Sequence, residues 1–284
     1  MTKNKSLRQK SILKSIFIFF IFVNLNCFAQ FKTYDGILKD IENNQPLAYV
    51  NIGIVDKNTG TVSDINGKFE LNLDDKFDNE ILRISMIGYI TQILKVKDFK
   101  ENIIKNNIFY LEKSVASLKE VVIKNKKLKT KILGNTLDKK TVSAGFVNNI
   151  LGNEIGIIIK IKRKPTYIEN FNAIVDYNNY GNFKFRINFY DLKNGLPNNS
   201  ILQENIIANS TVKKGKLTID LRDYNITVNK DFFVSIELIE GLGEGGLHFL
   251  ADYSGSPVIT RSASQGKWNK LEDLSFGFNL KCKY

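Results

Sequence analysis

The segment Leu274-Ser275-Phe276-Gly277-Phe278-Asn279-Leu280-Lys281-Cys282-Lys283-Tyr284 decides the fold class of this chain. Apolar residues occupy every second position, and this period places all of them on one side of a β-strand. Half-buried antiparallel strands have this pattern. We therefore predict that residues 146–284 form an all-β domain, a β-sandwich of jelly-roll type. Four further runs show the same alternation: Ile155–Ile161, Phe183–Phe189, Leu217–Leu221 and Leu247–Ala251.

Residues 31–112 contain shorter strand-like runs separated by turns. The Asn66-Gly67 pair precedes the strictly alternating run Lys68–Leu73, and an Asn-Gly pair before such a run is a strong hairpin signal. We expect a second β-sandwich here, of transthyretin or immunoglobulin-like type. Three other runs have strand character and no helical period: Tyr49–Val55, Ile81–Ile87 and Ile90–Val96.

The first 29 residues have the features of a secretory signal peptide. A basic stretch without acids precedes the apolar run Ile16–Val23, which is shorter than the ~20 residues of a spanning helix. We predict cleavage after Ala29, no transmembrane helix beyond it, and an extracytoplasmic location in the periplasm, at the outer membrane or outside the cell. Two alternatives stay open: an uncleaved anchor, and lipidation of Cys27, which the preceding Asn26 disfavours.

The positive charge of the chain concentrates in residues 113–145, which we interpret as a basic linker. The chain has 41 Lys and Arg against 29 Asp and Glu, a net charge of +12. Eight lysines and two acids lie between Lys119 and Lys140. Sites for single-stranded nucleic acids combine basic residues with interleaved aromatic residues, and these lysines have no aromatic residues between them. We therefore expect a solvated connector and no nucleic-acid partner.

Four elements of residues 33–112 occur in a recurrent order: Gly36–Asp40, Gln45–Ile52, Gly60–Phe69 and Ile87-Gly88-Tyr89. In this order the segment resembles the carboxypeptidase regulatory-like domain, a transthyretin-like sandwich of secreted and outer-membrane proteins of Bacteroidetes. The resemblance implies an envelope protein, because such domains often precede the plug of TonB-dependent receptors. It implies no proteolysis, since this domain is only attached to some carboxypeptidases. The C-terminal part is similar to uncharacterised sandwiches of the same bacteria, which imply no function.

The sequence contains no motif for a catalytic, cofactor or metal site. One His and two Cys exclude the multi-residue zinc sites. His248 is out of phase with its apolar neighbours and has no orienting partner, and Cys282 lies in the apolar row as a buried filler. The glycines of Gly241–Gly246 match a dinucleotide motif, but a strand follows where a helix is needed, so we expect a hairpin loop. The acids between Asp74 and Glu80 lack calcium-loop spacing, and a solvated turn is expected.

We therefore predict an exported, non-enzymatic binding or structural module of the cell envelope that mediates protein–protein or surface assembly. Its partner is expected to be an envelope protein or a polysaccharide. The alternative is a carbohydrate-binding module in which aromatic residues of the C-terminal sandwich stack on sugar rings. A hydrolase ranks last, because it needs two carboxylates that face each other in one cleft. The candidate stacking residues are Tyr180, Tyr190, Tyr253 and Trp268.

Overall fold

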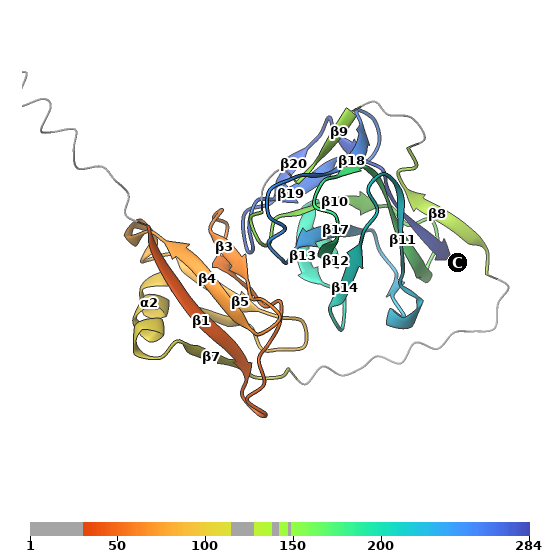
Figure 1. The fold of residues 1–284 in the computed structure, drawn as a ribbon. Helices are drawn as coiled ribbons and strands as arrows, with labels where there is room; N and C mark the ends of the chain where they lie inside the picture. The colour runs from red at the N-terminus through yellow and green to blue at the C-terminus, as the bar shows by residue number, and fades with distance from the viewer. Residues whose placement is uncertain (1–30, 115–127, 138–141, 147–148) are drawn as a thin grey trace, which may run out of the picture. The chain divides into compact units, whose positions relative to one another are not determined.

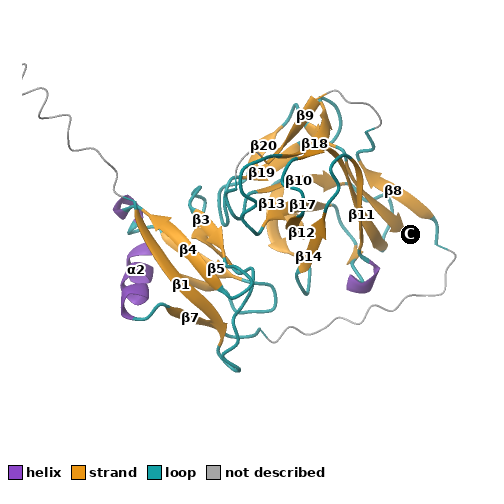
Figure 2. Ribbon diagram, in the orientation of Figure 1, coloured by secondary structure: helices purple, strands orange, loops and turns teal. Residues whose placement is uncertain are grey.

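The structure is a computed structural model that describes residues 31–114, 128–137, 142–146 and 149–284. Residues Thr33–Tyr284 belong to one unit of the chain. The described residues are almost entirely strands and loops (Figure 1), with one α-helix and two short 3-10 helices among them (Figure 2). This confirms the predicted all-β class. The predicted signal peptide, with Cys27 and the cleavage site at Ala29, lies outside the described residues.

The first part of the chain, here called the N-terminal sandwich, has two small sheets. Their strand orders are β4-β1-β7 and β3-β2-β5-β6. Leu38 and Leu71 of the first sheet share a buried cluster with Ile52 and Ile84 of the second, so the core lies between the sheets. The elements are β1 (Lys32–Asp40), β2 (Asn51–Ile54), β3 (Gly60–Val62), β4 (Lys68–Leu73), η1 (Asp75–Phe77), β5 (Ile81–Ser85), β6 (Gln92–Lys95), α2 (Val96–Lys105) and β7 (Ile108–Leu111).

Helix α2 corrects the expectation that this region lacks a helical period. Its buried residues include Val96, Phe99 and Ile103, which share one helical face. Phe99 stacks on Phe109 of β7, with 5.1 Å between the ring centroids. The helix starts directly after β6, inside the run Ile90–Val96 that reads as one strand, and the short helix leaves little room for its period to show. At ten residues and with five charged side chains, α2 is too short and too polar to cross a membrane, and no other described helix could do so.

The acidic cluster before β5 is a docking site for a buried lysine. The Lys100 ammonium of α2 donates to Asp75 Oδ1 at 2.6 Å and to Asp78 Oδ1 at 2.7 Å. Burial alone would lower the pKa of Lys100, but the two carboxylates raise it. The Asp74 carboxylate caps η1 by accepting from Lys76 N. These acids therefore hold α2 against the sandwich, whereas the sequence predicted only a solvated turn.

The second part, here called the C-terminal sandwich, has two larger sheets. One has the order β13-β12-β17-β10-β19-β20, with β14 beside β12. The other has the order β21-β18-β11-β22-β8, with β15 and β16 beside β11 and β9 beside β18. The elements are β8 (Thr130–Gly134), β9 (Val142–Phe146), β10 (Glu154–Ile159), β11 (Thr166–Asn178), β12 (Phe183–Lys193), β13 (Leu196–Ser200), β14 (Ile206–Ser210), β15 (Gly215–Asp220), η2 (Arg222–Tyr224), β16 (Thr227–Val228), β17 (Phe232–Leu238), β18 (Leu247–Asp252), β19 (Val258–Arg261), β20 (Asn269–Leu271), β21 (Ser275–Phe276) and β22 (Phe278–Lys283).

The alternating rows of the sequence form the core between these two sheets. One buried cluster contains Ile155, Ile157 and Ile159 of β10, the phenylalanines of β12 and the apolar row of β21 and β22. Cys282 is fully buried in this row, as the period predicts. Since side chains alternate along a strand, the β12–β17–β10–β19 sheet turns its other residues away from the core.

Two expectations differ from the structure. Strand β8 and all of β9 except its last residue, Phe146, lie within residues 113–145, where the sequence suggested only a linker. Strand β8 pairs with β22, and β9 pairs with β18. In β8 only Leu133 is buried, so the strand has too few apolar residues to stand out from the surrounding lysines. The Gly241–Gly246 segment joins β17 and β18, which belong to different sheets. It is thus a connection between sheets and not a hairpin loop, although no helix follows it.

Replacement of Phe99 should destabilise the N-terminal sandwich strongly. Phe99→Ala removes a fully buried ring, and such changes cost about 3–5 kcal/mol of unfolding free energy. Ile104 on the same helix is 68% exposed, so Ile104→Ala serves as the matched control and should cost less than about 0.5 kcal/mol. Urea unfolding followed by circular dichroism measures both. Equal losses in the two variants would contradict the assigned core.

The Cys282 thiol should be inert in the folded protein. Burial raises its pKa to about 12, whereas an ordinary thiol has a pKa of about 8.5. At about pH 8.5 the folded thiol thus stays protonated while the unfolded thiol ionises, so stability falls as the pH rises through that value. Thiol titration of protein that begins at Gln30 should show no reaction until denaturant is added. Rapid labelling of the native protein would refute the buried position.

Candidate functional site

The outer face of the β12–β17–β10–β19 sheet is polar. Arg186, Asn188 and Tyr190 of β12 alternate with the core phenylalanines, and Glu237 of β17 alternates with core aliphatic residues. Register places Glu237 opposite Glu154 of β10 and also opposite Arg186. A layer of charged and amide groups therefore lies on the side of the sheet opposite the hydrophobic core.

Two buried ion pairs organise this layer. Arg261 pairs with Glu154 at 2.6 Å, and Arg186 Nε lies 3.2 Å from Glu237 Oε2. Asn188 Nδ2 donates to both carboxylates, at 2.9 and 2.7 Å. Burial raises the pKa of Glu154, and the charge of Arg261 opposes this rise. The two acids face each other, as the hydrolase hypothesis requires, but both are fully buried and each is bound to an arginine.

Tyr190 and Trp268 join this layer through Arg261. The Arg261 guanidinium lies over the Trp268 ring, 4.7 Å from its centroid. Tyr190 and Trp268 pack in a T-shaped arrangement with 5.8 Å between their centroids. The Tyr190 hydroxyl accepts from Arg261 at 3.4 Å and donates to Glu154 at 3.3 Å. Burial raises the pKa of Tyr190 well above its usual value, so the hydroxyl keeps its proton for donation.

The segment Ser264–Trp268 docks on the N-terminal sandwich, which explains a stretch that no sequence pattern accounts for. Gly53 and Gly60 pair across β2 and β3. A Cβ atom on either glycine would lie 2.2 or 2.1 Å from the Ser264 carbonyl oxygen, so only glycine permits this approach. Gln265 then makes three hydrogen bonds to the N-terminal sandwich. Its Nε2 donates to Ser85 Oγ at 2.9 Å, its Oε1 accepts from Arg83 at 3.4 Å, and its carbonyl accepts from Asp56 N at 3.0 Å.

Tyr49 makes a second connection between the sandwiches. Its hydroxyl donates to Glu240 Oε1 at 2.6 Å, and Lys184 Nζ donates to both oxygens. The Tyr49 carbonyl accepts from Arg186 at 2.9 Å. The ring packs in a small apolar cluster with Val62 and Ile239. Tyr49 has a positive φ of 59°, a conformation that is uncommon outside glycine and that these contacts hold.

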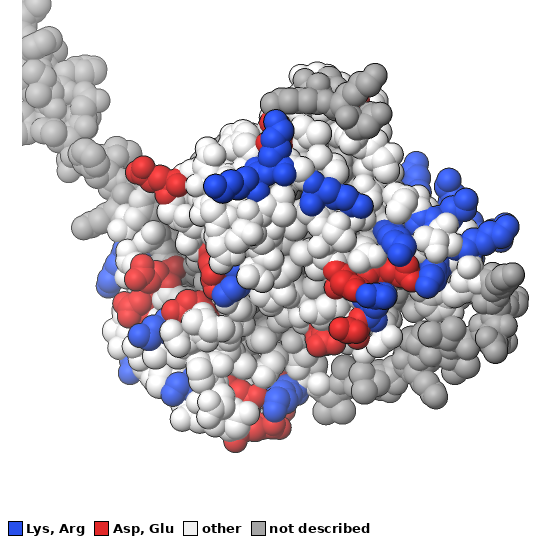
Figure 3. All heavy atoms as spheres, turned by 45° about the vertical axis from the view of Figure 1, so that its right-hand side comes forward, with Lys and Arg blue, Asp and Glu red and all other residues white. Residues whose placement is uncertain are grey.

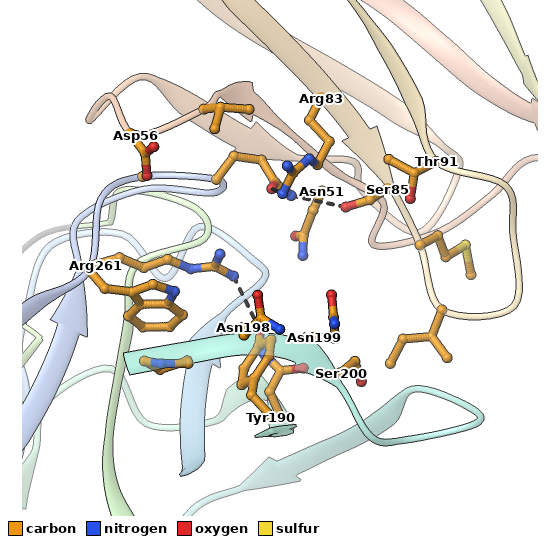
Figure 4. Close-up of a pocket in the computed structure, with 18 of the residues that line it drawn as sticks. Asn51, Asp56, Arg83, Ser85, Thr91, Tyr190, Asn198, Asn199, Ser200 and Arg261 are labelled. Atoms are coloured by element: carbon orange, nitrogen blue, oxygen red, sulfur yellow. Dashed lines mark hydrogen bonds between the residues drawn. The ribbon is translucent and has the colours of Figure 1, made fainter. Parts of the chain in front are cut away.

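A pocket of about 600 Å³ lies between the polar layer and the N-terminal sandwich. Figure 4 shows side chains from both parts converging on it. Arg261 is one of the residues that line the pocket. Its Nε is buried without a hydrogen-bond partner among the described residues. The described part of the chain contains no cluster of His, Cys, Asp and Glu able to hold a metal ion. The polar and aromatic lining residues are Asn51, Asp56, Arg83, Ser85, Thr91, Arg186, Asn188, Tyr190, Asn198, Asn199, Ser200, Arg261, Gln265 and Trp268.

The structure brings together two of the four aromatic residues singled out in the sequence. Tyr190 and Trp268 line the pocket. Tyr180 packs partly buried against the C-terminal core, and Tyr253 is 68% exposed in the loop after β18. His248 lies outside the pocket, where it stacks on Tyr177 with 4.4 Å between centroids.

Sequence reasoning missed most of the polar lining. One signal was present: Lys184, Arg186 and Asn188 occupy the polar phase of the Phe183–Phe189 row. A polar phase reads as solvent-facing, and nothing in the sequence indicates that a second domain covers it. The amides Asn198 and Asn199 carry no periodic signal, because they lie in β13 at the sheet edge.

Comparison with known proteins places the N-terminal sandwich in a family. Residues 34–123 match the CarboxypepD_reg-like domain. The TonB-dependent receptor SusC of Bacteroides thetaiotaomicron is 33% identical over 95 residues, which cover 34% of this chain and 9% of the receptor. The TonB-dependent receptor P3 of Formosa agariphila is 31% identical over 96 residues, with the same coverage. The match thus spans less than a tenth of the length of either receptor.

Solved structures add little to this. The cysteine protease and lectin-like domains of Cwp84, a surface layer associated protein of Clostridium difficile, align with 88% of this chain and 58% of that one. At 10% identity and a TM-score of 0.41, this likeness supports no argument. The match to the family and the two receptor relatives cover the same N-terminal segment. Residues 34–123 of this chain are therefore a carboxypeptidase regulatory-like domain, homologous to the corresponding segment of Bacteroidetes TonB-dependent receptors.

Proposed function

We propose that this chain is an exported, non-enzymatic binding module of the bacterial cell envelope, and that the pocket between its two sandwiches is the ligand site. The observation that carries this is the pocket lining. The C-terminal sandwich contributes the buried Arg186, Arg261 and Asn188, and the N-terminal sandwich contributes the half-buried Asn51 and Arg83. Preorganised polar groups of this kind bind ligands with little loss of side-chain entropy. The receptor relatives of the N-terminal sandwich support a place in the envelope, in the periplasm, at the outer membrane or outside the cell.

The electrostatics of the pocket favour binding over hydrolysis. Glu154 and Glu237 are each neutralised by an arginine and lie behind the lining residues. A general acid must be able to reach the substrate to transfer its proton. Asp56 is the one carboxylate among the described lining residues, so the lining lacks the pair of acids that glycoside hydrolysis uses.

The partner is an envelope protein or a polysaccharide, and the lining favours the carbohydrate. Amide, hydroxyl and guanidinium groups offer donors and acceptors that match sugar hydroxyls. Tyr190 and Trp268 add aromatic surface of the kind that stacks on sugar rings. Because the two buried arginines are paired with glutamates, the pocket is better suited to a neutral sugar than to an anion.

Loss of Trp268 should weaken ligand binding. A glycan array followed by calorimetry identifies the sugar, and Trp268→Ala should then reduce its affinity at least about tenfold, the equivalent of about 1.4 kcal/mol. Tyr253→Ala is the matched control, because Tyr253 is exposed outside the pocket. Its affinity should equal that of the wild type.

Other results would change the assignment. An envelope protein that binds the wild type and Tyr253→Ala but not Trp268→Ala would keep the pocket and replace the sugar by a protein partner. Equal affinity of all three proteins for every ligand would remove the pocket from the proposal. Turnover of a bound sugar would contradict the non-enzymatic assignment.

Gly60→Ala should open the pocket wall without damaging either core. The added Cβ would meet the Ser264 carbonyl at 2.1 Å, so the Ser264–Trp268 segment must move and ligand affinity should fall. The control is Gly241→Ala, because Gly241 has open space around its Cβ position. Thermal melting and calorimetry compare the two. Unchanged affinity in Gly60→Ala would contradict a role of this segment in the site.

A further inference from the structure

One end of the β11 sheet gathers basic segments that lie far apart in the sequence. β11 begins at Thr166, which pairs with Val228 at the end of β16. Its neighbour Tyr167 pairs with Lys283, and Lys283 pairs with Thr130 at the start of β8. The backbones of Lys129 and Tyr284 bond to each other. Four strand ends therefore meet at one edge of the sandwich: the start of β11, the ends of β16 and β22, and the start of β8.

The residues that flank this edge are mostly cationic. The loop 160–165 leads from β10 into β11, and the Thr166 hydroxyl ties it down by donating to the Arg163 carbonyl at 2.6 Å. Lys230 follows β16. Lys129 directly precedes β8, and Lys131 is the second residue of β8. The cationic residues at this edge are all exposed, and together they are here called the basic edge. They are Lys129, Lys131, Lys160, Lys162, Arg163, Lys164 and Lys230.

These cations are not used by the fold. None of them forms an ion pair with another residue in the described parts of the chain. The nearby Glu169 carboxylate is occupied by Lys281 and Lys283, at 3.2 and 2.6 Å. Asp231 accepts from Ile161 N at 2.9 Å, and it is the acid that the basic loop itself contacts. Seven cations against Asp231 leave a local surplus of positive charge. Figure 3 shows many blue side chains, with some red ones beside them, at the right of the view.

We propose that the basic edge docks the protein on an anionic membrane surface, through the phosphate groups of lipid headgroups. The cations come from three segments spread along one edge of a rigid sheet, and such an array matches a plane of charges. Each basic residue near an anionic bilayer increases the affinity of a protein for that bilayer several-fold, and salt screens this attraction. This surface is separate from the ligand pocket and does not rest on the function proposed for it.

The test uses vesicles and two triple variants of equal charge. The purified protein is sedimented with phosphatidylcholine vesicles that do or do not contain phosphatidylglycerol. The test variant is Lys160→Ser, Lys162→Ser and Lys164→Ser; the control is Lys213→Ser, Lys214→Ser and Lys216→Ser. The control lysines lie at the start of β15, where Gly215 pairs with Val175 of β11. Val175 is eight residues from Tyr167 at the basic edge, so at the rise of a β-strand the control lysines lie about 26 Å away along β11.

The wild type should sediment with the anionic vesicles only, and added salt should release it. The test variant should bind at least about tenfold more weakly, while the control variant should bind as the wild type does. Any of three results would overturn the proposal. These are an equal loss of vesicle binding in the two variants, equal binding of the wild type to both kinds of vesicle, and retention on an anionic polysaccharide without binding to vesicles. Thermal melting of the variants shows whether any loss reflects unfolding.

Discussion

Two buried ion pairs, Arg186–Glu237 and Arg261–Glu154, are the constraint on which the polar half of this protein depends. Charges removed from water are costly unless each has a partner and further hydrogen bonds. Asn188 and Tyr190 supply those bonds here. The sheet below them is held by a separate, wholly apolar core. Stability therefore resides on one face of this sheet, and the other face is available for a rigid array of polar groups.

The two sandwiches meet through contacts that leave little freedom in sequence. The Ser264 carbonyl lies so close to Gly53 and Gly60 that no side chain fits at either position. Tyr49 adopts a left-handed backbone conformation to reach Glu240 and Arg186. Because Asn51, Arg83 and Ser85 line the pocket, the regulatory-like domain forms part of the pocket wall. This arrangement gives a physical reason for a glycine pair and for the Ser264–Trp268 segment.

The proposed ligand pocket and the proposed membrane-docking edge differ in their electrostatics. In the pocket the charges of Arg186 and Arg261 are cancelled by glutamates, which suits a neutral polar ligand. At the basic edge the cations of the 160–165 loop have no partner in the described chain and face solvent. Electrostatic attraction at such a surface is sensitive to salt, whereas the sugar binding proposed for the pocket relies on short hydrogen bonds and stacking.

The sequence by itself determined the all-β class, the buried position of Cys282, the outward position of His248 and the family of residues 33–112. These follow from a period of two and from local turn residues, which are properties of neighbouring positions. It predicted neither α2 nor the strands β8 and β9, whose apolar patterns are short. Only the tertiary structure decided the site. Tyr190 contacts Trp268, and Arg186 contacts Asn51 across 135 positions of the chain. No local pattern encodes which polar face another domain will cover.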